Sequence, residues 1–151
     1  MLRLLSVLAV VFLFFAAPAR AAEDEGATLE VRVEGIQSDK GGELGIALFE
    51  NKKGYPTHSE HAYEPAWIPL TAEMATVEHR FEGLPAGDYA VSVLHDENGD
   101  RKMARTALGF PKEGVGFSNG QKVKLSAPDY EDCKFDLAEG EDKKIVIQID
   151  Y

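Results

Sequence analysis

The sequence predicts an all-β fold, an antiparallel β-sandwich. Several short segments alternate apolar and polar residues, which is typical of strands with one buried face. Turn residues, mainly Gly, Pro, Asp and Asn, separate these segments, and residues 22–151 show no sustained helical periodicity. This pattern favours a sandwich of immunoglobulin or prealbumin-like type, with about seven strands and two long loops, over a parallel sheet.

Six segments carry the alternation. They lie within residues 28–34, 43–50, 75–81, 89–93, 133–137 and 145–149. The turn sequence at 39–42 predicts a hairpin between the first two segments, and that at 139–142 predicts a hairpin between the last two. Residues 83–87 predict a tight connection, because Pro85 pre-sets its φ angle and the flanking glycines accept positive φ.

Two connections, 51–69 and 96–122, are long for a compact domain. Loops of this length are usually functional or disordered. Their aromatic and apolar residues argue against disorder, so we expect these loops to pack over the sandwich and to carry any site. The residues are Tyr55, Tyr63, Trp67, Phe110, Val115 and Phe117.

Residues 1–21 predict a secretory signal peptide, and residues 22–151 a single domain. Arg3 precedes an apolar run that is too short to span a bilayer, and small residues follow at Ala17, Ala19 and Ala21. We therefore expect a soluble periplasmic or extracellular protein. Cleavage would leave 14 basic and 26 acidic residues, a net charge of −12. That balance argues against nucleic acid or an anionic membrane surface as a partner.

The single cysteine, Cys133, excludes an intramolecular disulfide. Alternation places it on the same face as Phe135 and Leu137, which predicts a buried, inert thiol. The neighbouring Glu131 and Asp132 oppose the electropositive setting that a reactive thiolate needs.

Three stretches resemble an uncharacterised bacterial secreted family, domain of unknown function 2141. They are GELGIALFENKKGYP (42–56), FEGLPAGDYAVSVLHDENGD (81–100) and LGFPKEGVGFSN (108–119). The resemblance implies an exported, mostly β, single-domain protein and brings no catalytic residue. Family members often follow the HDENG motif with a G-K-L-D-like run. This chain has Arg101-Lys102-Met103-Ala104 there, so an acid is replaced by Ala104.

Asp96, Asn98 and Asp100 offer oxygen ligands at alternating positions, as a calcium loop does. The EF-hand pattern then fails, because Arg101 stands where glycine is needed and Ala107 where glutamate is needed. Further oxygens are available at Asp129, Glu131 and Asp132. The alternative is a polar turn whose side chains bond their own backbone.

The histidines raise a rival hypothesis of zinc or copper binding. His58 and His61 share one long loop and His95 borders the other, so three imidazoles meet only if the loops do. Otherwise His58 and His61 are solvated, His95 is a hydrogen-bonded residue at the rim, and His79 is part-buried beside Val77 and Phe81.

The function predicted from the sequence is a non-enzymatic binding module of unknown ligand, associated with the cell envelope. Its candidate ligand-binding residues are Tyr55, Trp67, His95 and Phe117, since aromatic side chains can stack on a sugar or peptide. The first alternative is a calcium or transition-metal protein. The second is a hydrolase built on His95, Asp96 and Ser118, for which the sequence holds no catalytic motif.

Overall fold

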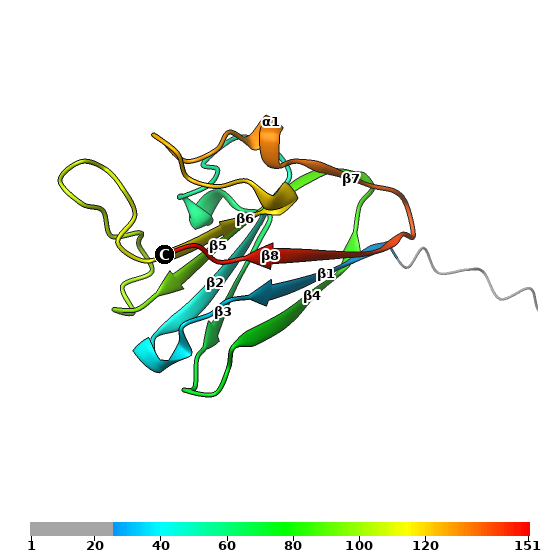
Figure 1. Ribbon diagram of the computed structural model, residues 1–151. Helices are drawn as coiled ribbons and strands as arrows, with labels where there is room; N and C mark the ends of the chain where they lie inside the picture. The colour runs from blue at the N-terminus through cyan, green and yellow to red at the C-terminus, as the bar shows by residue number, and fades with distance from the viewer. Residues whose placement is uncertain (1–25) are drawn as a thin grey trace, which may run out of the picture.

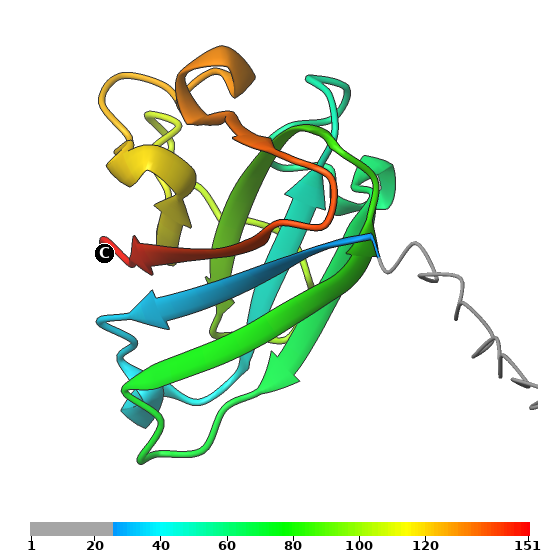
Figure 2. The same ribbon diagram turned by 90° about the vertical axis from the view of Figure 1, so that its right-hand side faces the viewer.

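Two β-sheets packed face to face form the protein in the computed structural model, which describes residues 26–151 (Figures 1 and 2). The smaller sheet has the order β4-β1-β8, and the larger has the order β3-β2-β5-β6, with β7 also paired to β5. The strands are β1 (Ala27–Glu34), β2 (Glu43–Phe49), β3 (Glu64–Pro69), β4 (Thr76–Leu84), β5 (Gly87–Asp96), β6 (Gly114–Phe117), β7 (Phe135–Leu137) and β8 (Asp142–Gln148). The predicted signal peptide lies outside the described residues.

The predicted all-β sandwich is confirmed, with eight strands in residues 26–151. Two of them lie inside the connections predicted as long loops: β3 in 51–69 and β6 in 96–122. Neither shows a clear alternation, because β3 contains two prolines and β6 has only four residues, two of them glycine. The long loops are therefore shorter than expected, and each leads into a strand of the larger sheet.

Both predicted hairpins are wrong. β1 and β2 belong to different sheets, and so do β7 and β8. β8 instead pairs with β1 in parallel, over Thr28–Asp142 to Glu34–Gln148, so the sandwich is not purely antiparallel. Turn residues mark where the chain changes direction, but they carry no information on which sheet the next strand joins.

The core lies between the inner faces of the two sheets, and alternation in the strands supplies it. Leu29, Val31 and Val33 of β1 face Leu44, Ile46 and Leu48 of β2, and all six are fully buried. A second buried cluster covers part of the outer face of the larger sheet. It contains Ala47, Phe49, Ala90, Val115, Phe117, Tyr130 and Cys133.

Cys133 is fully buried, as predicted, but in a different element. It ends α1 (Tyr130–Cys133), a single helical turn, and the strand starts only at Phe135. Burial raises the pKa of its thiol, which keeps the thiol protonated. Short 3-10 turns lie at Ser38–Lys40, Ser59–His61 and Ser118–Gly120. No helix within residues 26–151 is long and apolar enough to cross a bilayer.

Candidate functional site

The outer face of the larger sheet carries a narrow groove over β3, β2 and β5. Strand register sets two rows of side chains across this face, Trp67-Gly45-Leu94-Val115 and Pro65-Ala47-Ser92-Phe117. Gly45 and Ala47 of β2 and Ser92 of β5 have small side chains or none, and they form the floor of the groove. Trp67 and Phe117 stand higher on either side, and both line the groove.

Trp67 lies directly over Gly45. A Cβ atom at position 45 would come within 2.6 Å of the indole, so only glycine allows this packing. The indole thereby covers a strand glycine that has no side chain of its own, an arrangement that stabilises glycine in sheets. Trp67 is held as one wall of the groove and remains partly exposed.

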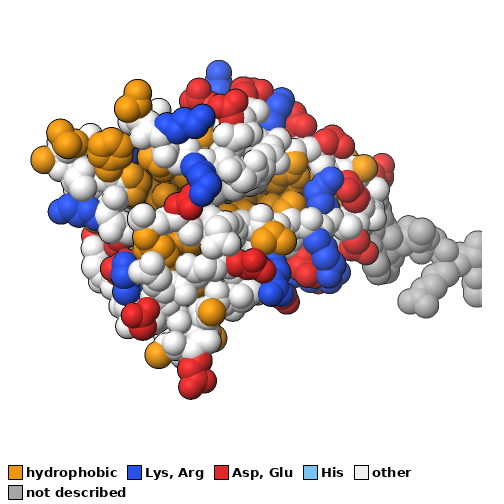
Figure 3. All heavy atoms as spheres, in the orientation of Figure 1, with side chains coloured by type: hydrophobic (Ala, Val, Ile, Leu, Met, Phe, Trp, Pro, Cys, Tyr) orange, Lys and Arg blue, Asp and Glu red, His pale blue; other side chains and the backbone are white. Residues whose placement is uncertain are grey.

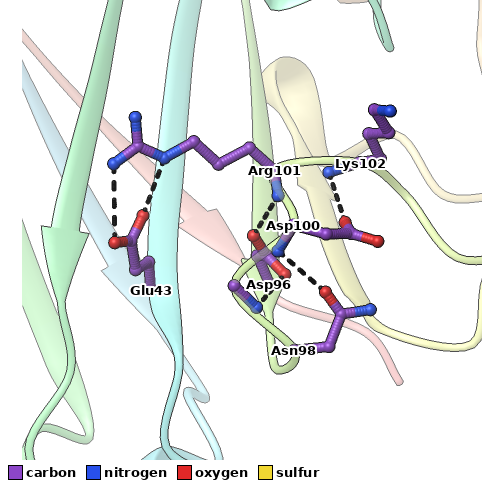
Figure 4. Close-up of polar contacts among 7 residues, drawn as sticks. Glu43, Asp96, Asn98, Asp100, Arg101 and Lys102 are labelled. Carbon is purple, nitrogen blue, oxygen red and sulfur yellow. Dashed lines mark hydrogen bonds and ion pairs between the residues drawn. The ribbon is translucent and has the colours of Figure 1, made fainter.

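Arg101 lines the groove, and its side chain reaches across to Glu43 at the start of β2 (Figure 4). Its guanidinium carbon lies 5.2 Å from the centre of the Trp67 ring, within the range of a cation–π contact. Its Nε donates to Oε2 of Glu43 at 3.1 Å. Both contacts are solvent-exposed, and contacts of this kind contribute only about 0.5–1 kcal/mol each. Arg101 can therefore leave Trp67 at low cost.

A turn after β5 places Arg101 over the groove. The buried Asp96 carboxylate accepts the backbone N–H of Gly99 at 2.8 Å and that of Arg101 at 2.6 Å. Asn98 and Asp100 accept the N–H groups of the residues two positions ahead, as Figure 4 shows. Arg101 adopts a positive φ of 56°, which the two bonds to Asp96 hold in place.

The loop after β2 forms part of the groove lining, through Pro56, Thr57 and Ser59. Ser92 donates from Oγ to the carbonyl of Pro56 at 2.9 Å, which fixes this loop on the sheet. Thr57 and Ser59 add hydroxyl groups to the lining, and Met103 adds an apolar side chain. The enclosed volume is about 30 Å³, room for about two water molecules. A larger ligand needs the Arg101 side chain to move aside.

Among the predicted ligand residues, the structure brings Trp67 and Phe117 to one groove. Tyr55 packs beside it against Phe49 and Tyr130, where burial, with Cys133 as a smaller cause, raises the pKa of its hydroxyl. The sequence reasoning missed Arg101, although it noted the residue as a departure in the loop. The floor of the groove was also not predicted, although the small residues at alternating positions of β2, Gly45 and Ala47, indicate it.

His95 lies away from the groove, on the inner face of β5. Its Nε2 is 2.7 Å from the carbonyl of Gly41, and its Nδ1 is 2.6 Å from the hydroxyl of Tyr151. A carbonyl only accepts, so Nε2 carries the proton. In the neutral ring, Nδ1 then accepts from Tyr151, whose oxygen in turn accepts the N–H of Gln37 at 2.8 Å. Both ring nitrogens are thus used within the protein.

The described residues contain no cluster of three or more His, Cys, Asp or Glu side chains placed to hold a metal ion. His58 pairs with Glu60 at 3.0 Å in its own loop, and its ring centre is 6.4 Å from that of His61. The oxygens of Asp96, Asn98 and Asp100 face backbone N–H groups, which is the arrangement of a polar turn. Calcium binding there stays a prediction.

Ser118, the serine considered for hydrolysis, is buried beneath the second cluster. Its Oγ donates to the carbonyl of Cys133 at 2.7 Å and accepts the N–H of Val91 at 3.0 Å. These bonds tie the turn after β6 to β5 and α1.

The fold and the groove define a β-sandwich protein with a narrow groove on the outer face of the larger sheet. Residues 31–145 match the family model described as "Uncharacterized protein conserved in bacteria (DUF2141)", and the chain belongs to this family. No curated protein and no solved structure matches the chain.

Proposed function

We propose that this protein is an exported binding module whose groove takes a small, flat, mainly apolar ligand with an acidic group. One observation carries the proposal: the small residues Ala47 and Ser92, paired across β2 and β5, leave a hollow between the Trp67 and Phe117 walls. Such concave, mostly apolar sites with a few polar groups are the usual places where small molecules bind.

The charge at the rim supports the acidic group. Arg101 is the charged residue that lines the groove, and its partner Glu43 is bound through an exposed ion pair. A ligand carboxylate can replace Glu43 on the guanidinium fork, which binds carboxylates with two parallel hydrogen bonds. The aromatic face of Trp67 then becomes available to the apolar body of the ligand.

Trp67 provides the readout, because it is the chain's single tryptophan. Benzoate serves as the probe and uncharged benzamide as its counterpart. We expect benzoate to change the Trp67 emission and to shift its indole N–H resonance in a saturable way, with benzamide weaker. Arg101→Gln should remove the preference for benzoate, because it removes the charge while leaving the floor intact.

Ala47→Leu fills the floor of the groove and should weaken benzoate binding by about tenfold or more, a loss of about 1.4 kcal/mol. Ala86→Leu is the matched control, since Ala86 is exposed between β4 and β5, away from the groove. Unfolding curves check that both variants fold. If benzoate gives no saturable change, or Ala47→Leu binds as the control does, the groove is not the site.

A further inference from the structure

A second surface of the protein, separate from the groove, presents apolar side chains on the tips of two ordered loops. The first is the loop between β5 and β6. Lys112 donates its N–H to Ala104 at 2.9 Å, Thr106 to Phe110 at 2.8 Å, and Arg105 donates from its side chain to Gly109 at 2.9 Å. These bonds form a braced hairpin whose tip exposes Leu108 (84%) and Phe110 (41%).

The second tip lies in the segment between β6 and α1. Leu125 is 94% exposed, at a turn in which Lys124 donates its N–H to Ser126. Arg105 and Gly109 of the first loop line the same hollow as Leu125, so the two tips are neighbours. Figures 1 and 2 place both loops at the same end of the molecule, and Figure 3 shows hydrophobic side chains gathered on the protruding loops there.

Basic residues surround these tips in a chain that is otherwise acidic. Residues 101–126 contain six Lys and Arg and one acid, Glu113, whereas the whole chain carries −10. Glu113 is buried and accepts two backbone N–H groups. Four of the six cations form no ion pair with another described residue: Lys102, Arg105, Lys112 and Lys124. The two loops are therefore richer in basic residues than the chain as a whole, and Asp129 is the acid that lines the hollow between them.

We propose that these two loop tips dock the protein on an anionic lipid bilayer. Leu108, Phe110 and Leu125 would enter the headgroup region, while the flanking Lys and Arg side chains contact lipid phosphates. The expectation from net charge, that an anionic membrane is disfavoured, applies to the averaged chain and not to this end. The acidic remainder would then point the rest of the molecule away from the surface.

The shape and composition of the surface favour a bilayer over a protein partner. The apolar residues stand on convex tips, whereas a stable protein interface needs a continuous patch of complementary shape. Lysine is depleted from protein interfaces, but it is attracted to anionic headgroups. A bilayer also accepts protruding leucines without a matching cavity.

The test is sedimentation of the full chain with vesicles of phosphatidylcholine, with and without phosphatidylglycerol. We expect binding to the anionic vesicles that weakens as salt is raised. Leu108→Ser with Leu125→Ser, and separately Lys112→Gln with Lys124→Gln, should each lower the partition coefficient by about tenfold. Val146→Ser with Lys144→Gln is the matched control, because it removes an exposed apolar residue and a lysine from β8, outside the two loops.

Each variant carries the same N-terminal segment, so differences between variants report the loops alone. A second measurement places tryptophan at the tip, as Phe110→Trp in a Trp67→Phe background. Its emission should shift to the blue with anionic vesicles only. Equal sedimentation of all variants, or no blue shift, overturns the proposal. So does concentration-dependent self-association that the loop variants abolish, because the tips would then join copies of the chain.

Discussion

Most of the buried polar side chains in this protein form hydrogen bonds that hold segments of the backbone in place. His95 binds the Gly41 carbonyl, Asp96 binds two turn amides, and Ser118 links β5 to α1. A buried polar group without a partner costs stability, so these bonds explain why such residues lie in an apolar interior. The sequence marked the same residues as catalytic or metal-binding candidates, because residue type alone does not separate these two roles.

Two exceptions are the Tyr55 hydroxyl and Nε2 of His79, which are buried without a hydrogen-bond partner among the described residues. His79 is the one with a consequence for pH dependence. Its ring packs edge-on against Phe81 at 4.6 Å. Burial lowers its pKa below the ordinary 6.5, and Glu64 opposes this only in part. As the pH falls, the unfolded chain therefore takes up the proton first. The contribution of neutral His79 to the free energy of unfolding is fully present above about pH 6.5 and is lost as the pH falls towards the lower folded pKa.

We predict that the free energy of unfolding of His79→Gln decreases less steeply than that of the wild type as the pH is lowered from 7 to just below 6.5. Urea unfolding at a series of pH values measures this slope. His61→Gln is the control, because His61 is exposed and should leave the slope unchanged. An unaltered slope in His79→Gln would mean that another group sets the pH dependence.

At the scale of elements, two buried acids build the connection between β5 and β6. Asp96 holds its first turn, and Glu113 accepts the N–H groups of Glu97 and Ala104. The connection thus carries Arg101 over the groove and Leu108 to the outer tip from one fixed base. The acid expected at position 104 is absent, and the backbone of Ala104 is bound by Glu113 instead.

Asp96→Ala should lower the free energy of unfolding by about 1–3 kcal/mol, because two backbone donors lose their acceptor. It should also speed trypsin cleavage after Arg101, Lys102 and Arg105, because the backbone of the turn is then no longer held in one conformation by Asp96. Asp100→Ala is the control, since Asp100 is exposed and accepts one amide; its effect should stay within about 0.5 kcal/mol. Equal cleavage of the two variants would show that Asp96 does not hold the connection.

At the scale of the whole molecule, alternation in the sequence predicted which faces are buried but not how the strands pair. Leu29, Val31 and Val33 were assigned correctly to one face, because burial is a property of each strand by itself. The parallel pairing of β1 with β8 joins segments more than 100 residues apart, and no local turn encodes it. The groove escaped prediction for the same reason: Ala47 and Ser92 become neighbouring floor residues only once β2 and β5 pair.

The C-terminal strand links the two sheets on the side opposite β3 and β4. After pairing with β1, the chain continues to Asp150, which exchanges two backbone hydrogen bonds of 2.9 Å with Val115 of β6. Gly116 makes this approach possible. A Cβ atom there would lie 2.6 Å from the Ile147 side chain and 3.0 Å from the backbone oxygen of Gln148.

We therefore expect Gly116→Ala to lower the free energy of unfolding by about 1–3 kcal/mol, because the added methyl group forces β8 away from β6. Urea unfolding measures the loss. Hydrogen exchange of the Asp150 amide should become faster, since that amide bonds to Val115 across the same junction. Gly87→Ala is the matched control, because its nearest neighbour would be Tyr89 at 3.9 Å and strand β5 has room for it. If both variants keep the wild-type stability and exchange rate, the close contact at Gly116 does not join the sheets.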